Sequence, residues 1–188
     1  MKWFGRKQKD NVVSGTKVLV SAVSADDALA STADRDANIY SMHYADVTNT
    51  PLAGDHSVID VIKSRPFDVV HLLVNVGPDG TIGQTYAKQI LRTCAKMDVK
   101  LVFVASDNPG DVYVSHFKPG PYNLVMTLER KGEKFWAFLD ALLSKMTLGK
   151  TMLSAWVEIA PQTEHAPEHD ALPEVFGHFR RENVILLR

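Results

Sequence analysis

Two apolar segments of the chain, residues 67–77 and 101–108, each break into polar residues near their ends. Asn75 follows the first apolar run, and Ser106 and Asp107 follow the second. Such runs are typical of parallel strands buried on both faces, and an α/β sheet places its chemistry at the carboxyl ends of these strands. A hydroxyl, a carboxylate and an amide at one edge could support hydrolysis or bind a partner or ligand.

The polar residues around these run ends define a candidate cleft for a ligand or partner. The stretch from Gly77 to Gly80 contains two glycines and a proline, but it matches neither the Walker A pattern nor the dinucleotide fingerprint. We therefore predict a turn there. The predicted cleft consists of Asn75, Gly77, Asp79, Ser106, Asp107 and Asn108.

Strand and helix patterns alternate along the chain, which predicts an α/β fold with a mainly parallel sheet in a three-layer α/β/α sandwich. We expect a basic tail over residues 1–16 and a single domain over residues 17–188, with a loop or short helix over 24–37. Asp55 is the expected N-cap of the first clear helix. The predicted strands cover 17–23, 38–44, 68–76, 100–106, 122–128 and 183–187, and the predicted helices cover 55–63, 84–97, 131–146 and 147–160.

Composition narrows the class of protein. The chain has 188 residues, 45% of them hydrophobic and 23% charged, and a formal net charge of −1. These values are ordinary for a globular domain and give no reason to expect nucleic acid as a partner. We also expect no membrane span and no signal peptide, because no apolar stretch is long enough. The single cysteine, Cys94, fits a reducing, cytoplasmic location.

Cys94 is the obvious candidate thiol nucleophile, but its position argues against that role. Within the predicted helix 84–97, Ala87, Ile90, Leu91 and Cys94 stand at positions i, i+3, i+4 and i+7. This spacing places them on one apolar face, so we expect Cys94 to be buried, with a raised pKa and little reactivity.

The two strand ends resemble those of CHAT domains, the caspase-like cysteine peptidases. Such domains typically carry a strand of the form Asp-Val-hydrophobic-His-hydrophobic, then a second histidine and a glycine. Residues 68–72, which contain His71, match the first half, and Asn75 stands at the position of the second, catalytic histidine. Residues 101–104 match the strand that precedes the nucleophilic cysteine, whose position is taken by Asp107. The strand and two helices that follow in these domains are similar to residues 124–128, 135–143 and 148–156.

The resemblance therefore implies a caspase-like fold without the peptidase dyad. An amide such as that of Asn75 does not titrate near neutral pH, and Asp107 cannot supply a thiolate. We therefore expect a catalytically inactive module that acts through protein interaction or regulation. The family context implies a bacterial signalling or antiphage system, with another protein of the same pathway as the partner.

Two alternatives stay open. An active hydrolase or nucleotide-processing enzyme could use Ser106 with Asp107, or with His43, His71 or His116, although we expect His71 to be a core histidine. A ligand-binding domain of flavodoxin-like or TIR-like topology could contact a small molecule through Asn75, Asp79, Ser106 and Asp107. We expect no metal, because His165 and His169 flank a proline and have no evident third ligand. We also expect no cofactor, because neither nucleotide-binding pattern is present.

Overall fold

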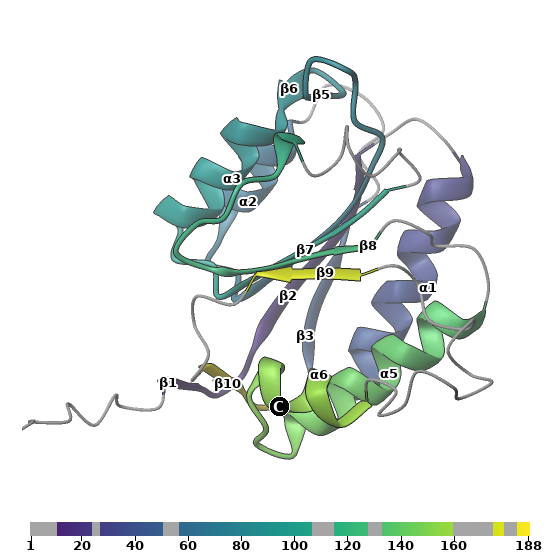
Figure 1. Ribbon diagram of the computed structural model, residues 1–188, viewed down its shortest axis with the longest axis vertical. Helices are drawn as coiled ribbons and strands as arrows, with labels where there is room; N and C mark the ends of the chain where they lie inside the picture. The colour runs from purple at the N-terminus through teal and green to yellow at the C-terminus, as the bar shows by residue number, and fades with distance from the viewer. Residues whose placement is uncertain are drawn as a thin grey trace, which may run out of the picture.

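The computed structural model describes residues 11–23, 27–50, 57–106, 115–127, 133–159, 175–178 and 184–188 (Figure 1). The central sheet has six strands, in the order β3-β2-β4-β7-β8-β9. Two small two-stranded sheets, β1-β10 and β5-β6, complete the strand set of the described residues. The strands are β1 (Asn11–Val13), β2 (Lys17–Val23), β3 (Asp46–Asn49), β4 (Val69–Val74), β5 (Thr81–Ile82), β6 (Thr85–Tyr86), β7 (Leu101–Ala105), β8 (Asn123–Thr127), β9 (Val175–His178) and β10 (Val184–Leu186).

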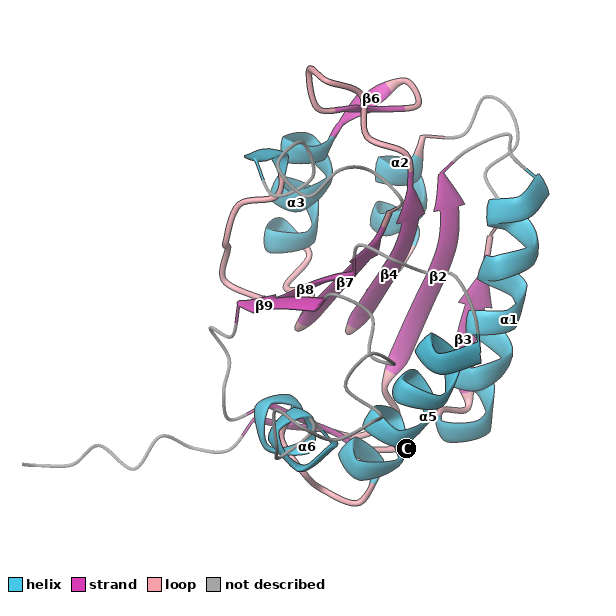
Figure 2. Ribbon diagram, turned by 45° about the vertical axis from the view of Figure 1, so that its right-hand side comes forward, coloured by secondary structure: helices cyan, strands magenta, loops and turns pink. Residues whose placement is uncertain are grey.

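Helices cover both faces of this sheet (Figure 2). They are α1 (Asp27–His43), α2 (Val58–Ser64), α3 (Ala87–Lys96), α5 (Glu133–Thr147) and α6 (Met152–Ile159). The helices α1 and α5 pack on the face of the sheet that carries the side chain of Phe103. The helices α2 and α3 pack on the opposite face, which carries the side chains of Val102 and Val104. The predicted three-layer α/β/α sandwich is thus confirmed.

The five strands β3, β2, β4, β7 and β8 are parallel, and β9 pairs antiparallel with β8 at the edge of the sheet. Numbered along the chain, the parallel strands follow the order 2-1-3-4-5, which is the order of flavodoxin-like sheets. The order reverses between β2 and β4, because the chain leaves β2 toward β3 on one side and continues from β4 on the other. A doubly wound sheet has its natural binding crevice outside the carboxyl ends of these two strands.

The prediction of a strand over residues 38–44 was wrong, because most of this segment belongs to α1. Ala33, Ala37, Tyr40 and Tyr44 are all buried, and they stand three or four residues apart, as on one face of a helix. The weak alternation around Ile39 hid this longer period. The second strand of the sheet is β3, which begins three residues after α1 ends.

Several smaller elements also differ from the prediction. The first, β1, lies within the predicted basic tail and pairs in parallel with β10, so the last predicted strand does not join the central sheet. The hairpin β5-β6 precedes α3, where we had expected helix from residue 84. Ser57 caps α2, since its hydroxyl accepts a hydrogen bond from the backbone N–H of Ile59 at 3.2 Å. The predicted cap, Asp55, lies outside the described residues.

None of the helices that the structure describes combines the length and the apolar character needed to cross a bilayer.

Candidate functional site

The candidate site lies at the carboxyl edge of the sheet, next to the point where the strand order reverses. Asn75 follows β4 directly and its side chain is exposed. The turn of the hairpin β5-β6 lies close to the carboxyl end of β2, because a Cβ on Gly83 would lie 3.9 Å from Cγ1 of Val23, the last residue of that strand. Asp107 and Asn108, predicted to share the cleft, lie outside the described residues. Of Asn75 and Asp107, the two residues that the sequence analysis aligned with the peptidase dyad, the structure describes Asn75.

The turn after Asn75 is held by backbone hydrogen bonds. The N–H of Gly77 donates to Thr81 O at 2.8 Å, and the N–H of Gly80 donates to Gly77 O at 2.8 Å. Asp79 completes the turn, because its Oδ1 accepts from the Thr81 hydroxyl at 2.7 Å and from the Thr81 N–H at 3.1 Å. These bonds, led by the one from the hydroxyl, lower the pKa of the Asp79 carboxyl. The predicted turn is confirmed, and Asp79 is occupied in ordering it.

His116 packs against this turn from the segment that precedes β8. Its Nε2 lies 3.0 Å from the carbonyl oxygen of Pro78. A Cβ on Gly80 would lie only 2.5 Å from His116 Nδ1, so the imidazole occupies the space that any other residue at position 80 would need. The hydrogen bond to Pro78 and the contact with Gly80 fix the position of His116, one of the bases considered for a hydrolase.

His71 lies in the core and not at the strand end. Its side chain is completely buried, and its ring stacks on Phe103 with the centroids 4.5 Å apart. The edges of two further rings complete the enclosure, with Tyr40 at 5.6 Å and Phe135 at 6.4 Å. This confirms the expectation of a core histidine, and a substrate could not reach the imidazole without opening the domain.

A buried polar cluster surrounds this imidazole. His71 Nε2 lies 3.3 Å from Asp36 Oδ2, and both side chains are fully buried. His71 Nδ1 lies 3.2 Å from the hydroxyl of Tyr40. The other carboxylate oxygen of Asp36 accepts a hydrogen bond from Trp136 Nε1 at 3.0 Å. We call Asp36, Tyr40, His71 and Trp136 the α1–β4–α5 cluster, because it joins these three elements in the core.

Sequence reasoning missed Asp36, Tyr40 and Trp136 as a group. The signal for the first two was present: Asp36 and Tyr40 are four residues apart, and Asp36 lies between two alanines of the apolar face of α1. A charged residue on an apolar helix face needs a buried partner. Because residues 38–44 were predicted as a strand, that face was not recognised.

Ser106 and His71 lie on opposite faces of the sheet. His71 pairs in register with Phe103, and both side chains face α1 and α5. Ser106 comes two residues after Val104, whose side chain packs against α2 and α3, so the alternation of the strand directs it to that side. Ser106 is buried, and its N–H donates to Thr127 O at 3.2 Å. The structure thus keeps these two groups apart.

His43 lies at the other end of the sheet. It ends α1 three residues before β3 begins, and β3 starts beside the first residue of β2, so His43 is at the amino edge. Its Nε2 contacts Asp140 Oδ1 at 2.6 Å. The structure therefore places His43 and Ser106 at opposite edges of the sheet.

Cys94 belongs to the buried face of α3, and its side chain packs among residues of β4 and β7. Burial in this apolar environment raises the pKa of its thiol to about 12. The prediction of an inert, buried cysteine is confirmed, because the reactive thiolate is scarce at neutral pH.

The raised pKa of Cys94 predicts a loss of stability at alkaline pH. The unfolded thiol titrates near its ordinary pKa of 9.0, whereas the folded thiol keeps its proton up to about pH 12. The stabilisation is therefore complete below pH 9 and decreases above it, because only the unfolded chain loses the proton. Between pH 7 and 10 we expect wild type to lose about 1.4 kcal/mol relative to Cys94→Ala.

Urea unfolding of both proteins at the two pH values measures this double difference. The tyrosines are common to both proteins, and Tyr122, whose pKa the Cys94 charge also raises, is held at a pKa of about 12 mainly by burial and stays protonated at pH 10. If wild type and Cys94→Ala lose equal stability between pH 7 and 10, the thiol is not protonated in the folded core as described.

No group of three or more histidine, cysteine, aspartate or glutamate side chains suited to a metal ion occurs in the described part of the chain. The pair His165 and His169 lies outside it. In comparisons with known proteins, no family model matches the chain, and no curated protein matches it either.

Proposed function

We propose that the chain is a CHAT-like domain without peptidase activity, which acts as a protein-interaction or regulatory module. The proposal rests on the resemblance of the two strand ends and on the burial of His71, the histidine that the matching motif contains. An imidazole enclosed by Phe103, Tyr40 and Phe135 cannot take a proton from a substrate in the folded domain. The one cysteine is equally inaccessible.

The binding site in this proposal is the carboxyl edge around Asn75. The exposed amide of Asn75 can both donate and accept hydrogen bonds. The turn that follows it is ordered by backbone hydrogen bonds, which restricts the backbone next to Asn75. Asp107 and Asn108 follow the neighbouring strand in the sequence, and we include them in the proposed contact surface. We propose that the partner is another protein of the same bacterial signalling or defence pathway, as the resemblance implies.

A matched pair of variants tests the proposed surface. Asn75→Arg introduces a bulky charge at the carboxyl edge, and Asn38→Arg makes the same change at an exposed position of α1. We expect proteins captured by the tagged wild-type chain to be retained by Asn38→Arg and lost from Asn75→Arg. Mass spectrometry should also show that the captured partner has its full-length mass, because a domain without peptidase activity does not cleave it.

Equal capture by both variants would place the surface elsewhere. A captured partner shortened by wild type, but not by a variant with Ser106→Ala, would instead show that the domain is a peptidase.

The strand order favours a second candidate, a domain that binds a small ligand at the same edge. Sheets of order 2-1-3-4-5 bind ligands where the order reverses, and Asn75 follows one of the two strands at that point. In this function the exposed Asn75 would contact the ligand. It differs from the first proposal in its readout, because purified protein alone would show the binding.

A further inference from the structure

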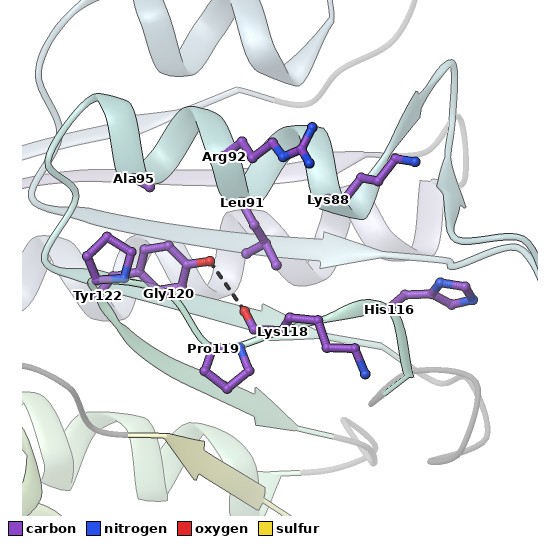
Figure 3. A pocket seen from close by; sticks show the side chains of 10 residues that line it. Lys88, Leu91, Arg92, Ala95, His116, Lys118, Pro119, Gly120 and Tyr122 are labelled. Carbon is purple, nitrogen blue, oxygen red and sulfur yellow. Dashed lines mark hydrogen bonds between the residues drawn. The ribbon is translucent and has the colours of Figure 1, made fainter.

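A pocket of about 340 Å³ opens along α3 (Figure 3), and His116, which packs against the turn after Asn75, is one of the residues that line it. Its two walls are α3 and the segment that leads into β8, and Leu91 points from α3 toward that segment. The volume is at the lower end of the range of small-molecule sites. A contact surface for a folded partner would be far larger and flatter.

The pocket exists because of how the chain connects β7 to β8. A parallel crossover usually carries a helix that packs on the sheet. Here residues 115 and 116 are helical, and residues 117–122, which follow them and lead into β8, form neither helix nor strand. Phe117 and Tyr122 bury their rings against the sheet, which leaves a hollow between this segment and α3.

The segment is fixed in shape before any ligand arrives. Pro119 and Pro121 restrict its backbone, and the hydroxyl of Tyr122 donates to Lys118 O at 3.4 Å. The ring of Tyr122 packs directly on Gly120, where a Cβ would lie 2.4 Å from the ring. A preformed wall of this kind lowers the entropy cost of binding.

Positive charge is concentrated at this pocket. Lys88 and Arg92 line it from α3, and Lys118 lines it from the facing segment. Within the described residues none of these three side chains forms an ion pair; Lys88 Nζ instead lies 5.5 Å from the centroid of the Tyr86 ring. Elsewhere Lys145 and Lys150 both pair with a glutamate.

Lys88 and Arg92 stand four residues apart on one helix, so they repel one another in the empty pocket. An anion between the two walls would relieve this repulsion and accept hydrogen bonds from both sides. The lining contains no acidic side chain that could do so. The excess is local, because the whole chain has a net charge of −1.

We propose that this pocket binds a small phosphorylated ligand with an apolar ring. Arg92 and Lys118 would hold the phosphate, since a guanidinium offers a planar pair of donors and an ammonium a compact charge. Leu91, Ala95 and the prolines of the facing wall would contact the ring. The inference does not depend on the function proposed above, because it involves neither Asn75 nor catalysis.

The test is calorimetric titration of the purified chain with adenosine 5′-monophosphate, adenosine and inorganic phosphate. We expect the monophosphate to bind at least tenfold more tightly than either other compound, and its affinity to fall as salt is added. Arg92→Glu should weaken binding tenfold or more. Lys96→Glu, an equal charge change at an exposed position of the same helix outside the lining, should change affinity less than twofold.

Three results would overturn the proposal: no binding of the monophosphate at about 10 mM, well above useful affinities for such sites, equal losses in both variants, or tighter binding of a hexaglutamate peptide. The last would identify an acidic protein segment as the occupant. Because the titration uses purified protein, it can fail while the partner captured through Asn75 is unaffected, and the reverse also holds.

Discussion

Replacing Asp36 with leucine is expected to lower the free energy of unfolding by about 2–5 kcal/mol, because it removes the buried carboxylate that faces Trp136 Nε1 and His71 Nε2. The carboxylate of Asp36 accepts from Trp136 Nε1 at 3.0 Å and lies 3.3 Å from His71 Nε2. Leucine would leave both groups facing apolar atoms in a region without access to water. Urea unfolding followed by circular dichroism measures the loss.

Three further variants separate this effect from general damage to α1. Asn38→Leu adds the same side chain at an exposed position of the helix and should change stability by less than about 0.5 kcal/mol. Asp36→Asn keeps an acceptor for Trp136 and should cost less than Asp36→Leu, so it provides a folded protein if the leucine variant does not fold. Asp36→Leu combined with His71→Phe should be more stable than Asp36→Leu alone, because no buried imidazole is left unpaired. Equal costs for Asp36→Leu and Asn38→Leu would refute the role of the α1–β4–α5 cluster.

Gly80→Ala is expected to destabilise the domain by about 2–3 kcal/mol, the sum of a backbone term and a lost contact. Gly80 has φ +82°, a left-handed conformation that costs any residue with a Cβ. The new methyl group would also lie 2.5 Å from His116 Nδ1, so the imidazole must leave its position beside Pro78 O. Thermal and urea unfolding both report the change.

Gly149→Ala is the matched control, because Gly149 has φ +90° but no atom within 4 Å of the added carbon. It should incur only the backbone cost of about 1–2 kcal/mol. In a His116→Ala background, the cost of Gly80→Ala should fall to that of the control, since the clash is gone. If Gly80→Ala costs the same with and without His116, the imidazole does not occupy the described position.

The central strands could be predicted because each is a continuous apolar run that is buried on both faces. The segments that form β4, β7 and β8 consist entirely of buried residues. The strand β3 is short and only partly buried, so its sequence has no such run. The helix α1 was mistaken in part for a strand because its buried face contains alanines and tyrosines, with polar residues between them.

The candidate site was harder to predict, because the role of a side chain depends on its face and its partners. His71 lies within a matching motif, yet strand alternation directs it to the face covered by α1 and α5, where Asp36 and Trp136 come from elements distant in sequence. Asp79, which was predicted to contact a ligand, also orders the turn through local bonds to Thr81, and that role was not predicted. The cationic pocket combines α3 with a segment about thirty residues later, and no local pattern indicates such a contact.

The α1–β4–α5 cluster also restricts how this sequence can change over evolution. A carboxylate without its imidazole, or an indole N–H without its carboxylate, would be destabilising in the core, so single substitutions at these positions would be selected against. Asp36, His71 and Trp136 should therefore persist together or be replaced together by apolar residues in related chains. Such covariation would allow distant relatives to be recognised through their interior rather than through their strand-end motifs.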